Sequence, residues 1–94
     1  MSVNIYPAYL DEHKCICHAD NWDNESTLNI ANGNFYSLVD TMKMGLWMDK
    51  VPGQMPIKVL ESALDKAPST NYTNRLKKIC AIARVKRVNL IAFS

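Results

Sequence analysis

Alternating apolar and polar positions near the start of the chain predict β-strands. Val3 to Tyr6 alternate and predict a short strand that Pro7 ends. The segment HKCICHA, residues 13–19, alternates again, and Leu28 and Ile30 share one face of a third strand. A polar loop of about seven residues joins the second and third segments, so we expect these two to form a hairpin.

The middle of the chain changes to a helical period. A first helix is predicted after the Asn-Gly-Asn turn, with Asn32 or Asn34 as its N-cap and Gly45 at its end. Its apolar stripe, at the spacing of one helix face, consists of Phe35, Leu38, Val39, Met42 and Leu46.

Two further helices follow a connector in which Pro52-Gly53 fits a type II turn. One helix begins at Pro56 and stops at Pro68. Its stripe contains Ile57, Leu60 and Leu64. The other runs from about Tyr72 to Val85, is capped within residues 69–71, and buries Leu76, Ile79, Cys80 and Ala83.

The last segment, Val88 to Phe93, is almost entirely apolar and predicts a strand buried on both faces. Such a strand belongs inside the sheet, between the N-terminal strands. The expectation is therefore one α+β domain over residues 1–94 in two layers. A mixed sheet of three or four strands, in the order β-β-β-α-α-α-β, is covered on one face by three helices.

Composition is that of an ordinary globular chain, with 48% hydrophobic and 21% charged residues. No apolar run approaches the roughly 18 residues that span a bilayer. The N-terminal residues do not resemble a secretory signal, and three cysteines are an odd number for a disulfide framework. We therefore expect a cytoplasmic protein with reduced thiols and no membrane association.

Charge is divided unevenly along the chain. Residues 1–40 carry six acidic side chains and one basic one, whereas residues 41–94 carry ten basic side chains and three acidic ones. A division of this kind affects association rather than fold.

The segment around Cys15 and Cys17 contains the residues that could carry metal or thiol chemistry. His13 and His18 flank the two cysteines, but Cys-x-Cys followed at once by histidine is not the spacing of a structural zinc site. We expect two small core cysteines and two surface histidines. No metal, cofactor or catalytic residue is predicted, so the chain is not expected to be an enzyme. Whether these four residues have a redox or metal role stays open.

The basic segment from Arg75 to Arg87 favours a nucleic-acid interface as an alternative. Its candidate residues are Arg75, Lys77, Lys78, Arg84, Lys86 and Arg87. On a helical wheel these side chains scatter around an apolar helix instead of forming one stripe. Basic stems around a buried helix are the simpler interpretation.

Tryptophan and methionine are the other candidates for contact with a partner. Trp22 lies in a polar loop, and Trp47 lies near several methionines around the connector. Such residues either fill the core or form a hydrophobic contact patch. The sequence leaves both possibilities open.

The junction Leu28-Asn29-Ile30-Ala31-Asn32-Gly33-Asn34 resembles a pattern in small uncharacterised phage and bacterial proteins. In those proteins a strand ending Leu-Asn-aliphatic leads through Asn-x-Asn into a helix. The resemblance implies a phage or mobile-element origin and supplies no activity. Whether Asn29, Asn32 and Asn34 bind anything or only cap a helix is left open.

The leading hypothesis is a non-enzymatic protein-interaction module that regulates or inhibits a host protein. The acidic N-terminal half could imitate phosphate charge toward a basic partner. The expected contact residues are, first, Asp20, Trp22, Asp23 and Glu25, and then Trp47 and Lys50. The identity of the partner and the oligomeric state do not follow from the sequence.

Overall fold

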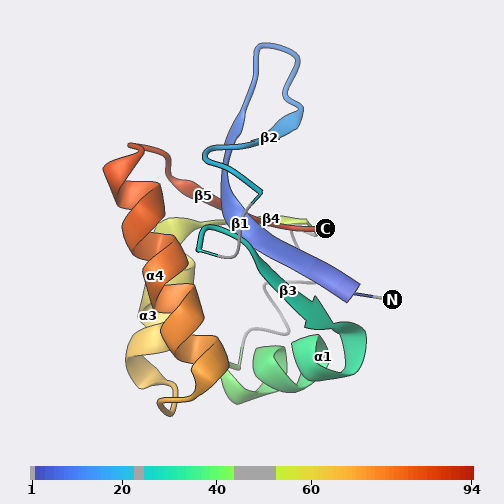
Figure 1. The fold of residues 1–94 in the computed structure, drawn as a ribbon. Coiled ribbons are helices and arrows are strands. Elements are labelled where there is room, and N and C mark those ends of the chain that lie inside the picture. The colour runs from blue at the N-terminus through green and yellow to red at the C-terminus, as the bar shows by residue number, and fades with distance from the viewer. Residues whose placement is uncertain (1, 23–24, 44–52) are drawn as a thin grey trace.

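In the described part of the chain, a five-stranded antiparallel sheet carries the fold, with three helices packed against it (Figure 1). The computed structural model describes residues 2–22, 25–43 and 53–94. The elements are β1 (Ser2–Leu10), β2 (Ile16–His18), β3 (Leu28–Ala31), α1 (Asn32–Thr41), β4 (Gln54–Pro56), α3 (Ile57–Lys66), α4 (Asn71–Val85) and β5 (Leu90–Phe93). The predicted α+β class, with helices on a sheet, is confirmed.

Strand β1 is the centre of the sheet because it pairs with three other strands. Along one edge it pairs with β3 through residues 2–5 and with β2 through residues 8–10. Along the other edge it pairs with β5, which in turn pairs with β4. All four pairings are antiparallel, so the expected mixed sheet of three or four strands is instead antiparallel and five-stranded.

Pro7 does not end the first strand, contrary to the sequence prediction. Asn4 and Ser94 exchange both backbone hydrogen bonds, so the alternation of the ladder places Pro7 and Ile91 in a non-hydrogen-bonded pair. On its other edge Pro7 falls between the part of β1 that pairs with β3 and the part that pairs with β2. The missing amide proton of proline therefore removes little pairing there.

The predicted hairpin between the second and third strands is also wrong. Both β2 and β3 pair with β1, and the hairpin is formed by β1 and β2, which project beyond the helices (Figure 1). The C-terminal strand β5 lies inside the sheet, as predicted, but between β1 and β4 rather than between two N-terminal strands.

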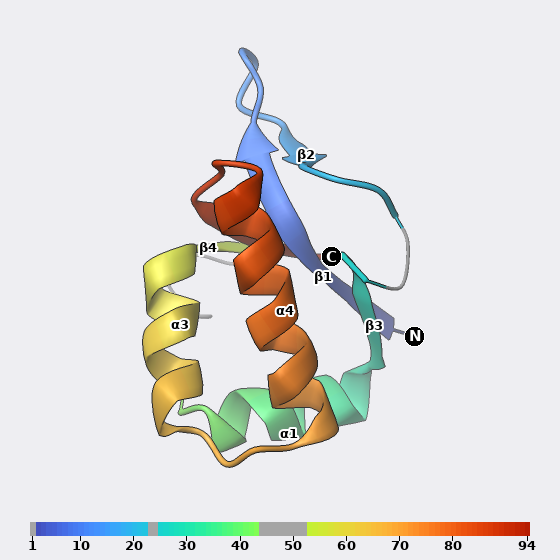
Figure 2. The same cartoon turned by 60° about the vertical axis from the view of Figure 1, so that its left-hand side comes forward.

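The three helices lie on one face of the sheet (Figure 2). Helices α3 and α4 run side by side, and α1 lies across the end where they are connected (Figure 2). The helical stripes predicted from the sequence are buried in one core with Ile5, Ile30 and Ile91 of the sheet, except for Leu46, which lies outside the described residues. The stripe residues in this core are Phe35, Leu38, Val39, Met42, Ile57, Leu60, Leu64, Leu76, Ile79, Cys80 and Ala83.

Helix α1 begins without the asparagine cap that the sequence predicts. Its N-cap is Ala31, which has no side-chain capping bond, so Asn32 and Asn34 lie within the first turn. The Asn34 amide instead donates to the Tyr72 hydroxyl at 3.2 Å. The helix ends at Thr41, before Gly45, and Gly45 lies outside the described residues.

Helix α4 has well-defined caps at both ends. Thr70 and Thr73 form a capping box, and the buried Thr73 hydroxyl also donates to the carbonyl of Pro68. At the other end the amide of Val88 donates to the Ala83 carbonyl at 3.0 Å and that of Arg87 to the Arg84 carbonyl at 3.1 Å. These two bonds form a Schellman motif.

Arg87 has φ 60°, the left-handed conformation for which glycine is favoured in this motif. We therefore expect Arg87→Gly to raise the free energy of unfolding by about 0.5–1 kcal/mol, measured by denaturant titration. The matched control is Arg87→Ala, which retains a Cβ atom and should leave stability close to that of the wild type. Equal stabilisation by both substitutions would contradict this explanation.

Candidate functional site

Three aromatic rings pack together where β1, β2 and the following loop meet. Tyr6 of β1 and His18 of β2 stack with ring centroids 4.7 Å apart and planes inclined by 7°. The Trp22 ring contacts both of them, at 4.6 Å from Tyr6 and 4.5 Å from His18. Tyr6 is buried, whereas Trp22 remains 63% exposed, so the stack presents one large aromatic ring to solvent.

Hydrogen bonds of His18 fix the loop that carries Trp22. The Asp20 backbone amide donates to His18 Nδ1 at 3.0 Å. An acceptor at Nδ1 places the proton of the neutral ring on Nε2, which lies 2.8 Å from Thr27 Oγ1. The imidazole thus bridges the two ends of the loop and holds Trp22 against Tyr6.

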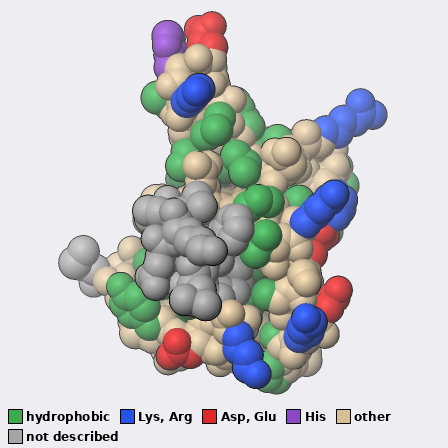
Figure 3. Space-filling model, turned by 180° about the vertical axis from the view of Figure 1, so that it is seen from behind, with side chains coloured by type: hydrophobic (Ala, Val, Ile, Leu, Met, Phe, Trp, Pro, Cys, Tyr) green, Lys and Arg blue, Asp and Glu red, His purple; other side chains and the backbone are tan. Residues whose placement is uncertain are grey.

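The apolar surface continues from the stack onto the projecting hairpin. Because side chains alternate along a strand, Tyr6, Leu10, Ile16 and His18 lie on the same face of the β1–β2 pair, and Leu10 is paired directly with Ile16. Leu10 and Ile16 are each 40% exposed. We call the surface formed by Tyr6, Leu10, Ile16, His18 and Trp22 the aromatic face. Hydrophobic side chains are visible along the hairpin when the molecule is seen from behind (Figure 3).

The turn of the β1–β2 hairpin is held by hydrogen bonds to Asp11. Asp11 Oδ1 accepts hydrogen bonds from the amides of His13 at 2.8 Å and Cys15 at 2.9 Å. Lys14 completes the turn with φ 61°. The Asp11 carboxylate is therefore part of the turn.

The acidic residues predicted to contact a partner differ in their surroundings. The Asp20 carboxylate lies 3.4 Å from the ammonium of Lys86, so it is paired within the molecule. Glu25 is exposed and borders a cavity with Arg75 and Lys78. Asp23, Trp47 and Lys50, which were also predicted to contact a partner, lie outside the described residues.

Half of the basic residues predicted for nucleic-acid binding have partners within the molecule. The Arg84 guanidinium binds both carboxylate oxygens of Glu61, and this bond lowers the pKa of Glu61 below its usual value. Arg75 donates to the Thr27 carbonyl at 3.3 Å, and Lys86 pairs with Asp20. The other three, Lys77, Lys78 and Arg87, are exposed.

Two of the three cysteines, Cys15 and Cys17, do not lie where the sequence placed them, whereas Cys80 is buried as predicted. Cys15 is exposed and Cys17 is half-buried, so the two are not core residues. Cys17 Sγ lies 3.9 Å from Asp11 Oδ2. Cys80 is buried, and this burial raises the pKa of its thiol to about 12. Within residues 2–22, 25–43 and 53–94, no three His, Cys, Asp or Glu side chains come together in a group that could hold a metal ion.

No helix in the described part of the chain has the length and apolar character needed to cross a membrane. Comparison of the chain with family models, with curated proteins and with solved structures finds no significant match. The resemblance of the residue 28–34 junction to phage and bacterial proteins therefore remains a prediction.

Sequence reasoning identified Trp22 but missed the residues on which it packs. Residues 6–10, Tyr-Pro-Ala-Tyr-Leu, form a continuous apolar run that would have indicated a strand up to residue 10 if Pro7 had not been interpreted as a stop. His18 was predicted to be a surface histidine, whereas it is half-buried in the stack.

Thiol reactivity offers a direct check of this arrangement. At pH 8 we expect Cys15 to react rapidly with an aromatic disulfide reagent and Cys80 to react only when the protein unfolds, because the reactive form is the thiolate. The absorbance of the released thiol measures both phases. In Cys15→Ser the rapid phase should lose the amplitude of one thiol, and rapid reaction of all remaining thiols in the folded protein would contradict the burial of Cys80.

Proposed function

We propose that this chain is a non-enzymatic protein-interaction module that binds its partner through the aromatic face. The observation that carries the proposal is the exposed Trp22 ring, held in place by Tyr6 and His18. A preordered aromatic ring loses little conformational entropy on binding, and tryptophan is enriched among the residues that dominate binding energy.

The neighbouring hairpin extends the proposed contact surface. Leu10 and Ile16 add two branched apolar side chains, and the hairpin projects from the body where a partner can reach it (Figure 1). Large apolar side chains grouped on a projecting element are typical of contact sites.

The proposed contact is apolar at its centre rather than an imitation of phosphate. Asp20 is neutralised by Lys86 and Asp11 is bonded to the hairpin turn, so neither carboxylate is fully available to a basic partner. Glu12, at the exposed turn, supplies charge only at the rim, where it affects the rate of association more than affinity.

The proposal includes a cytoplasmic location and a regulatory or inhibitory action on a host protein. The phage or mobile-element origin rests on the junction motif alone. A nucleic-acid interface on α4 is the less favoured alternative, because Arg75, Arg84 and Lys86 already have internal partners.

Truncation of Trp22 tests the proposal. We expect Trp22→Ala to reduce partner capture from an extract of the source cells by at least about tenfold, since hot-spot truncations cost about 2 kcal/mol or more. Quantitative mass spectrometry of the retained proteins measures the change. The matched control is Tyr36→Ala, which removes a ring of similar exposure, 66%, from α1. Equal loss with both variants, or none with Trp22→Ala, would contradict the proposed surface.

Retention of the protein on immobilised DNA distinguishes the protein-interaction module from the alternative, a nucleic-acid interface on α4. The interaction module should elute from immobilised DNA below physiological salt. Retention that falls steeply with salt and is weakened by Lys77→Gln and Lys78→Gln would instead support the basic face of α4.

A further inference from the structure

A groove of about 570 Å³ lies between the end of α1 and the outer side of α3. Met42, Val59 and Ala63 supply its apolar lining. Its volume is within the range of about 300–1,000 Å³ that is typical of small-molecule sites. The groove shares no residue with the aromatic face, so it is a separate feature of the surface.

The polar residues of the groove are basic or hydroxylic. Lys43, Lys58 and Lys66 line it together with Ser62, and no acidic residue lines it within the described part of the chain. The same part of the chain provides no ion pair for any of these three lysines. A cluster of ammonium groups that has no ion pair within the described residues, beside apolar side chains, is complementary to a ligand with an anionic head and an apolar body.

Helix α3 sorts its charges by side. Lys58, Ser62 and Lys66 recur every four residues on the side of the groove. Glu61 and Asp65, also four residues apart, do not line this groove but a separate cavity between α3 and α4. Helix α3 has no opposite charges four residues apart, and the charged side chains on its groove side are all basic.

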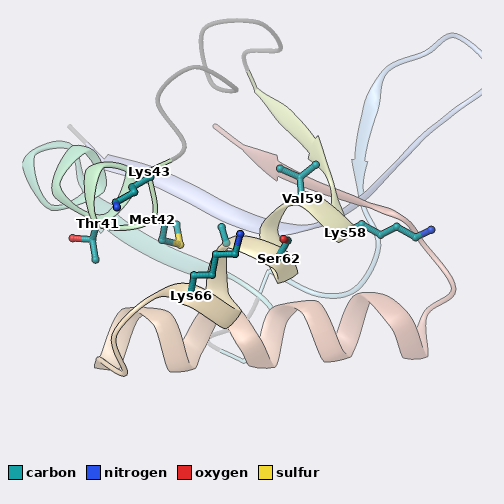
Figure 4. A pocket seen from close by; sticks show the side chains of 8 residues that line it. Thr41, Met42, Lys43, Lys58, Val59, Ser62 and Lys66 are labelled. Atoms are coloured by element: carbon teal, nitrogen blue, oxygen red, sulfur yellow. The ribbon is translucent and has the colours of Figure 1, made fainter.

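Lys43, just after the end of α1, adds another basic side chain to the groove. It follows the C-cap Met42 with φ 56°, a conformation for which glycine is favoured. Lys43 and Lys66 lie on either side of Met42 at one end of the groove, with Ser62 next to Lys66, whereas Lys58 points away at the other end (Figure 4).

We propose that the groove binds a small organic anion, with a carboxylate head between Lys43 and Lys66 and a hydrocarbon body on Met42, Val59 and Ala63. Ser62 can donate a further hydrogen bond to the head. Because the site combines two cations with an apolar surface, a neutral ligand of the same length should bind more weakly.

The test is a titration of isotopically labelled protein with decanoate and with decanol, followed by amide chemical shifts. We expect decanoate to shift amides of the groove, around residues 42–43 and 58–66, and to bind at least about threefold more tightly than decanol. Lys66→Gln should weaken decanoate binding about threefold to fivefold and leave decanol binding unchanged. Lys77→Gln, a control on the exposed side of α4, should change neither.

A second variant separates binding from stability. Lys43→Gly removes an ammonium and also relieves the positive φ, so it should weaken decanoate binding while raising the midpoint of thermal unfolding. The proposal is overturned if decanoate and decanol bind equally or if the shifted amides scatter over the surface. It is also overturned if Lys77→Gln weakens decanoate as much as Lys66→Gln does.

Discussion

The pairing of β1 with three strands is the constraint on which the rest of this structure depends. One continuous strand of nine residues holds the chain terminus Leu90–Phe93 on one edge and both β2 and β3 on the other. Its odd-numbered residue Ile5 faces the helical core, and its even-numbered Tyr6 and Ala8 face away from the helices. Destabilising β1 would therefore disturb the core and the aromatic face together.

The same strand explains why the two candidate sites differ in character. Beyond Ala8 the helices no longer cover β1, so the hairpin leaves Tyr9, Leu10 and Ile16 exposed. The groove beside α3, in contrast, is formed by helix residues at a distance from β1. The aromatic face is therefore a surface of the sheet, whereas the groove depends on how α1 and α3 pack.

The sequence predicted well the parts of the fold that depend on local periodicity. The stripes of α3 and α4 and the apolar β5 are each recognisable because burial on one face or two imposes a regular pattern. Pairing was less predictable. Strands β2 and β3 both pair with β1 through contacts between residues distant in sequence. The strand accommodates Pro7 because of the register of these pairings, and the register cannot be recognised from a local sequence pattern.

The candidate site was predicted only in part for the same reason. Trp22 was recognisable as an apolar residue in a polar loop, but its support by Tyr6 and His18 follows from the register of β1 and β2. Cys15 and Cys17 were misplaced because alternation was extended over residues 13–15, where the chain actually turns through Lys14. Ion pairs such as Lys86 with Asp20 join segments far apart in the chain and are not visible in composition.

The outer margin of the sheet has a consequence for how any second polypeptide could attach. In β4 the residues 53, 55 and 57 face β5, so the outward positions are Gln54 and Pro56, and proline has no amide proton to donate. The opposite margin is divided between β2 and β3, of three and four residues. Within the described residues, neither edge offers a long row of free backbone groups to an added strand. Recognition through backbone pairing is therefore disfavoured there, and a second polypeptide would have to bind through side chains.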